Sequence, residues 1–112
     1  MYTYQRVIKM TDLQEVAKTI VNQIMTIDKW ALAAWGYNKP MVYTKDNKPT
    51  LGFRCSGTKV RKGGFCEISL NEAQDLYEVR LFRIIGLNQT TLGAKTEVFW
   101  EDLVSVCDEL IG

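Results

Sequence analysis

Residues 51–82 read LGFRCSGTKVRKGGFCEISLNEAQDLYEVRLF, and this stretch predicts an antiparallel meander. Apolar and polar side chains alternate over residues 51–56, 65–70 and 77–82, with turn-forming residues between these runs. Alternation of this kind is typical of strands that bury one face. We therefore expect three neighbouring strands that share one apolar face.

One register aligns the apolar side chains of these strands. It pairs Leu51 with Leu70, Phe53 with Ile68, Cys55 with Cys66, Ile68 with Val79 and Cys66 with Leu81. A slip of one residue would turn every apolar side chain to water, so we expect this register. The opposite face then carries a predicted charged row of Arg54, Glu67 and Arg80.

The flanking segments complete an α+β fold. Residues 41–44 predict an outer strand joined to the meander by the turn KDNK. Apolar residues at helical spacing predict a helix from Leu13 through Ile27, with an extension toward Trp35 and a stop at Gly36. We expect a four-stranded antiparallel meander with one N-terminal and one C-terminal helix packed on one face.

The ends and the last connection need separate interpretation. Residues 97–111 predict the C-terminal helix, and residues 87–95 predict a polar loop, with a short strand as the alternative. Residues 1–10 suit either a short strand or an ordered arm. The length of 112 residues predicts a single domain, residues 1–112.

Composition excludes several classes of protein. The chain is 46% hydrophobic and 24% charged, which is typical of an ordinary globular domain. Its net charge of +1, from 14 basic and 13 acidic residues, gives no attraction of the whole molecule to nucleic acid or to an anionic membrane. Only a local charged patch would provide such an attraction.

The cysteines and the N-terminus predict a cytoplasmic protein. The chain has three cysteines and no C-x-x-C pair, residues 1–6 lack the apolar core of a signal peptide, and no apolar run reaches the roughly 18 residues that span a bilayer. We expect free thiols and no association with a membrane. Cys55 and Cys66 are predicted to be buried thiols, with a cross-strand disulfide under oxidation as the alternative.

The residues for common catalytic sites are missing. The chain has no histidine, which removes Ser–His and Cys–His pairs and the commonest zinc ligand. The acidic pairs Glu101-Asp102 and Asp108-Glu109 are adjacent in sequence and do not face each other on a helix. We therefore predict no enzymatic activity, no metal and no cofactor. An enzyme would need carboxylates that converge from distant segments.

The polar face of the sheet is the first candidate for binding. Phe65 and Phe82 are predicted to face each other beside Arg54 and Arg80, near the basic loop residues Lys59, Arg61 and Lys62. Aromatic rings with neighbouring cations are typical of platforms for single-stranded nucleic acid. The alternatives are an interface for self-association or for a protein partner, a face covered by the N-terminal arm, and a basic loop that is simply solvated.

A second candidate lies at the end of the first predicted helix. Trp35 and Tyr37 flank Gly36, and exposed aromatics of this kind would anchor a protein partner. Large aromatics at such a position are expected to close one end of the core, and the partner anchor is the alternative to that expectation.

Strand and turn signatures also indicate a resemblance. A strand with Phe53, a basic loop with glycine, residues 65–71 (FCEISLN), residues 75–79 (DLYEV) and a closing Phe82 resemble small proteins encoded by bacteriophages and mobile elements of gut bacteria. The helix before these strands and the terminal helix also fit that family. The family has no assigned activity, so the resemblance implies no site residues. We expect a non-enzymatic binding protein of phage or mobile-element origin.

Overall fold

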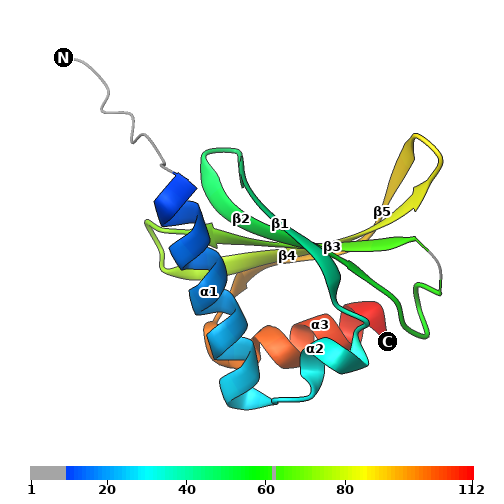
Figure 1. Cartoon of the computed structure of the whole chain (residues 1–112), viewed down its shortest axis with the longest axis horizontal. Coiled ribbons are helices and arrows are strands. Elements are labelled where there is room, and N and C mark those ends of the chain that lie inside the picture. Colours follow the sequence, from blue (N-terminus) through cyan, green and yellow to red (C-terminus); the bar gives the residue numbers. More distant parts are fainter. Residues whose placement is uncertain (1–9, 62) are drawn as a thin grey trace.

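The structure, a computed structural model, describes residues 10–61 and 63–112, and Figure 1 shows the whole chain. The elements in chain order are α1 (Met10–Ile27), α2 (Ala31–Ala34), β1 (Asn38–Lys45), β2 (Lys48–Cys55), β3 (Gly64–Asn71), β4 (Leu76–Ile85), β5 (Asn88–Val98), the 3-10 helix η1 (Trp100–Asp102) and α3 (Leu103–Ile111). The predicted N-terminal strand or arm lies outside the described residues, except that Met10 begins α1.

Within the described residues, five antiparallel strands form one sheet in the order β1-β2-β3-β4-β5. The prediction of four strands is wrong because residues 88–98 form β5 instead of a loop. β5 lies at the edge of the sheet and is exposed along most of its length, so its sequence shows no apolar alternation. The C-terminal helix α3 starts at Leu103, later than predicted, because Glu97 still belongs to β5.

The registers are partly as predicted. Phe65 lies opposite Phe82 in the β3–β4 pair, which confirms that register. In the β2–β3 pair, however, Phe53 faces Cys66, so the predicted register is wrong by two residues. A shift of two residues leaves every side chain on its predicted face, so the apolar pattern does not distinguish the two pairings. As a result Cys55 faces Gly64 and does not pair with Cys66.

The core lies between the sheet and the helices. Figure 1 shows α1, α2 and α3 on the same side of the sheet. The largest fully buried side chains include Phe53, Ile20, Ile24, Leu51, Ile68, Leu81, Leu103 and Ile111. The predicted end of the helical region at Gly36 is confirmed: this glycine has a φ of +65°, a backbone angle that favours glycine.

Two hairpins shape the outer face of the sheet, which is the face away from the helices. The β1–β2 turn uses Asp46 and Asn47 with φ angles of +52° and +61°, as a two-residue turn with left-handed backbone requires. Figure 1 shows the tips of the β1–β2 and β4–β5 hairpins bending away from the helices. The outer face is therefore concave, and this concavity positions the candidate site.

Candidate binding surface

The concave outer face contains a hollow of about 480 Å³, which we call the central hollow. Strands β1, β2, β3, β4 and β5 each contribute to its lining, which consists of Lys39, Met41, Tyr43, Arg54, Phe65, Glu67, Ile84 and Gln89. It therefore spans the full width of the sheet and combines cationic, aromatic and aliphatic side chains.

A buried carboxylate lies at the base of the hollow. Glu67 is 6% exposed, accepts a hydrogen bond from the Tyr43 hydroxyl, and accepts another from Lys45 Nζ at 2.6 Å. Burial, followed by the hydrogen bond to Glu67, raises the pKa of Tyr43. Tyr43 therefore keeps its proton at neutral pH, and the Lys45 charge offsets the Glu67 charge. This network is a satisfied structural unit and offers no free acid or base.

Phe82 is covered by the same network. Its ring is 4% exposed and lies 4.9 Å from Lys45 Nζ, measured to the ring centroid. The prediction that Phe82 forms a stacking platform is therefore wrong, because Lys45 at the end of β1 occupies that position. Phe65 is only half-buried and lines the central hollow, so its ring remains available.

The predicted charged row is also only partly present. Glu67 and Arg80 are opposite each other, as predicted, but Arg54 lies opposite Phe65 because of the two-residue register difference. Arg54 is exposed and lines the central hollow, whereas Arg80 is half-buried. Arg54 is therefore the cation that lies beside the half-buried ring of Phe65.

The basic loop borders a second hollow at the end of the sheet. Lys59 and Arg61 line this hollow of about 770 Å³ together with Arg83 from β4. Lys62 lies outside the described residues. Lys59 also has a structural role, because its Nζ donates a hydrogen bond of 2.6 Å to the Glu109 carbonyl near the end of α3.

Within the described residues, the two hollows adjoin through shared lining residues. Ile84 lines both, and a smaller hollow shares Lys39 and Arg54 with the first and Gly63 with the second. The cations along this surface, which we call the basic track, are Lys39, Arg54, Lys59, Arg61 and Arg83. Among the described residues that line the three hollows, Glu67 is the one carboxylate, and Lys45 offsets its charge.

Sequence reasoning missed two members of the basic track. Lys39 has a φ of +49° at a bulge between Asn38 and Met41, and this irregularity brings it to the hollow. Arg83 lies near the end of β4, which extends to Ile85 as the sequence predicts, and it lines the second hollow beside the basic loop. The alternation of apolar residues does not indicate that Lys39 or Arg83 lines a hollow. The one hint in the sequence is that residues 79–96, which include Arg83, contain no acidic residue.

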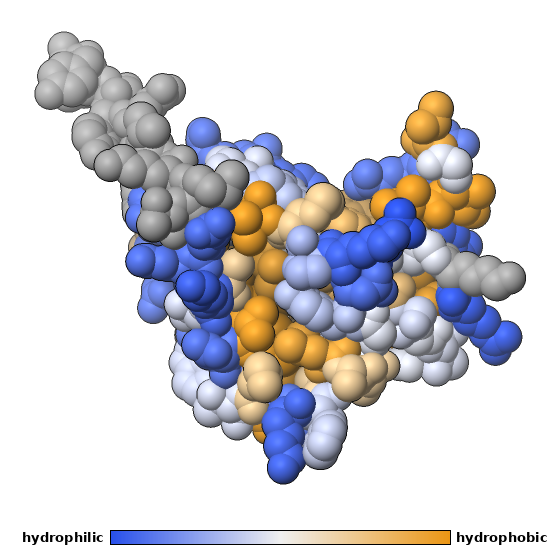
Figure 2. All heavy atoms as spheres, viewed as in Figure 1, coloured by the Kyte–Doolittle hydropathy of each residue, from blue (hydrophilic) through white to orange (hydrophobic). Residues whose placement is uncertain are grey.

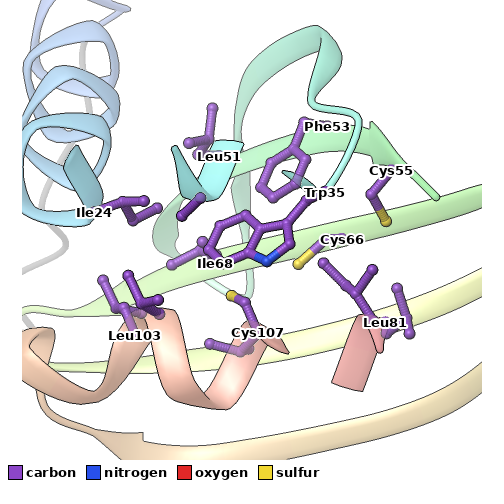
Figure 3. Packing of buried hydrophobic residues seen from close by; sticks show 14 of the residues in the cluster. Ile24, Trp35, Leu51, Phe53, Cys55, Cys66, Ile68, Leu81, Leu103 and Cys107 are labelled. Atoms are coloured by element: carbon purple, nitrogen blue, oxygen red, sulfur yellow. The ribbon is translucent and has the colours of Figure 1, made fainter. Parts of the chain in front are cut away.

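The predicted aromatic anchor is largely internal. Trp35 is 2% exposed, and its indole N–H donates a hydrogen bond of 2.6 Å to Asp108. Figure 3 shows its ring among the buried side chains, with Phe53 and Cys107 nearby. The expectation that Trp35 closes one end of the core is confirmed, and the alternative of an exposed anchor is wrong for this residue. Tyr37 is half-buried and packs against Phe53, with ring centroids 4.8 Å apart.

Other kinds of site find no support in the described part of the chain. Among residues 10–61 and 63–112, no group of three or more Cys, Asp or Glu side chains is placed to hold a metal ion. None of the described helices has the length and hydropathy needed to cross a membrane.

Comparisons with known proteins found no matching family model, no matching curated protein and no matching solved structure. The resemblance to small proteins of phages and mobile elements therefore stays a prediction, and the candidate function rests on the basic track and the hollows beside it.

Proposed function

We propose that this chain is a non-enzymatic binding protein and that its ligand is single-stranded nucleic acid. The observation that carries the proposal is the basic track, which runs from the central hollow on the outer face, beside the half-buried ring of Phe65, to the hollow at the end of the sheet. Proteins that bind single strands combine a cationic groove that follows the backbone with aromatic rings on which bases stack.

The electrostatics of the surface support an anionic ligand. The basic track contributes five cations, whereas the lining carboxylate, Glu67, is buried and bonded to Lys45 and Tyr43. The whole chain has a net charge of only +1, but the basic track has a local excess of positive charge. In the proposed complex, a base stacks on Phe65 beside Arg54, and the strand continues so that Arg83 contacts a phosphate in the hollow at the end of the sheet.

A non-enzymatic role agrees with the chemistry of the site. The raised pKa of Tyr43 opposes a role as a base, and the Glu67 carboxylate already accepts two hydrogen bonds. We also propose a reducing, cytoplasmic setting, because the three cysteines, all in described segments, are free thiols. A phage or mobile-element origin is a separate proposal that rests on the sequence resemblance alone.

The test is the fluorescence anisotropy of a labelled oligothymidine titrated with the protein at several salt concentrations. We expect binding that weakens as salt rises, because the cations release counterions from the strand. Replacing Arg54 or Arg83 by Ala should each reduce the salt slope by about 0.7. The matched control is Lys29→Ala, which removes an exposed cation at the end of α1, away from the track.

Substitutions of Phe65 separate stacking from electrostatics. Phe65→Ala should weaken binding about 5-fold to 150-fold, corresponding to roughly 1–3 kcal/mol per stacked base. Phe65→Leu keeps an apolar side chain but lacks an aromatic face, so it should weaken binding nearly as much. Binding that responds to neither Phe65 nor the track arginines would refute the proposed site.

Light scattering tests the alternative of self-association. A stable dimer whose mass does not change with the oligonucleotide, and which Phe65→Ala dissociates, would assign the outer face to a subunit interface. A mass increase that occurs only with the oligonucleotide, and that disappears at high salt, supports the nucleic-acid assignment.

A further inference from the structure

The tip of the β4–β5 hairpin carries exposed aliphatic side chains. Ile85 is 67% exposed, and Leu87 is fully exposed. The hairpin closes with a two-residue turn, Gly86-Leu87, in which Gly86 has a φ of +59° and no atoms near the position of a side chain. The turn thus projects Leu87 directly into solvent.

The figures show how this tip stands out from the molecule. In Figure 1 the β4–β5 hairpin rises away from the sheet, and Figure 2 shows apolar side chains on the same projection. We call Ile85 and Leu87 the hairpin tip. Exposed apolar groups that gather in one place mark interaction sites, whereas single exposed aliphatic residues are ordinary.

Cations surround the base of the hairpin tip. Arg83 lies two residues before Ile85, and both line the same hollow as Lys59 and Arg61 of the neighbouring loop. The two segments that build this end of the molecule, residues 54–66 and 79–96, contain no Asp or Glu. The charged side chains of these two segments, next to the exposed aliphatic residues, are therefore all positive.

We propose that the hairpin tip binds the surface of an anionic phospholipid bilayer. Leu87 and Ile85 enter the boundary between headgroups and acyl chains, while Arg83, Lys59 and Arg61 contact lipid phosphates. Interfacial binding of this kind depends on buried apolar area together with attraction to anionic lipids. It differs from spanning the bilayer, and it goes beyond the proposed nucleic-acid function because it depends on the aliphatic tip.

The shape and chemistry of the tip favour lipid over other partners. A two-residue aliphatic turn offers little of the roughly 800 Å² that each partner buries in a standard protein interface, and leucine is under-represented in hot spots. Nucleic acid would gain nothing from Leu87, because an aliphatic side chain has no aromatic face for a base. Acyl chains, in contrast, need no matching shape.

The test is co-sedimentation of the full chain with phosphatidylcholine vesicles, with and without phosphatidylglycerol. We expect binding only to the anionic vesicles. The double substitution I85S/L87S should weaken this binding about tenfold or more, because both side chains lose their transfer into the lipid boundary. Arg83→Ala should weaken binding to anionic vesicles through the loss of one lipid contact.

Controls separate insertion from other effects. Ile27→Ser removes a comparably exposed aliphatic side chain, 45% exposed at the end of α1, and should leave vesicle binding unchanged. Both tip residues are largely exposed, so I85S/L87S should unfold at the parent's urea concentration, which a parallel titration checks.

Three outcomes would overturn the proposal. They are no binding to anionic vesicles, binding that depends on Arg83 but not on the hairpin tip, and a dimer in light scattering that I85S/L87S dissociates. The third would make the tip an interface with a second copy. Oligothymidine binding by the single variant Leu87→Ser, whose side chain lines none of the three hollows, should equal that of the parent, so failure here and failure of the nucleic-acid proposal give different results.

Discussion

At the scale of single residues, Gly52 makes the central hollow possible. It lies on the outer face of β2 opposite Glu67, and a Cβ added there would stand 2.6 Å from the Phe65 ring and 2.7 Å from the Tyr43 hydroxyl. A glycine inside a strand often marks a place where another group approaches closely. Here the close groups are the ring proposed for stacking and the donor that holds Glu67.

Gly52→Ala should therefore destabilise the protein. Overpacking of this kind costs about 1–3 kcal/mol, which exceeds the roughly 0.5–1 kcal/mol that alanine gains over glycine in a strand. Urea unfolding measures the change, and the double variant G52A/F65A is the control. Because removing the Phe65 ring makes room for the new methyl group, the two effects should be less than additive. Full additivity would show that the ring does not restrict position 52.

At the scale of elements, the differences between prediction and structure have separate physical causes. Alternation predicted which face each strand of the meander buries, because that information is local. The β2–β3 register depends on how the connection at residues 56–63 closes, and a shift of two residues leaves the pattern unchanged. For β5 the sequence predicts a loop, with a short strand only as the alternative, because this edge strand is exposed and carries polar residues such as Thr90 and Thr91.

The connection between β2 and β3 is an ordered element in the part that is described. Val60 is fully buried, and the backbone N–H groups of Thr58 and Lys59 donate hydrogen bonds to the carbonyls of Gly112 and Ile111. The loop therefore satisfies carbonyl groups at the end of α3, where a helix has no internal partners. Val60, which lies between Lys59 and Arg61 in the sequence, anchors the described part of the loop in the core.

Val60→Ala should lower the free energy of unfolding by about 2 kcal/mol, from the lost burial of two methyl groups and the cavity that remains. It should also weaken oligothymidine binding, because the loop that carries Arg61 loses its fixed position. The matched control is Thr58→Ala on the same loop, where the side chain is exposed and the stability should hardly change. If the two variants have equal stability, the loop is not anchored through Val60.

At the scale of the whole molecule, the two faces of the sheet have different roles. The inner face packs against the helices, whereas the outer face combines a fixed polar network with an open cationic surface. Sequence reasoning predicted Arg54 and Phe65 on the outer face, because strand alternation places them there. The covering of Phe82 by Lys45 and the position of Lys39 at a bulge in β1 depend on how distant strands come together, which no local pattern encodes.

The core as a whole gives the protein a specific sensitivity to alkali. Burial, with a smaller contribution from Cys107, raises the pKa of Cys55 from 9.0 to about 11. A hydrogen bond with Cys107, followed by burial, raises the pKa of Cys66, and burial raises the pKa of Tyr77 to about 12. Below pH 9 these groups are protonated in both states, so their contribution to stability is fully present.

Above pH 9 the unfolded chain releases thiol protons that the native state retains, so the free energy of unfolding should fall between about pH 9 and pH 11. The slope is about 1.4 kcal/mol per pH unit for each such thiol. Urea unfolding at a series of pH values measures it, and Cys55→Ala should make the slope shallower. Val60→Ala removes buried volume without removing a titrating group and should keep the parent slope at lower overall stability. A free energy that does not change from pH 9 to pH 11 would mean that the thiols ionise inside the folded core, which the packing of Cys55 and Cys66 against the core does not permit.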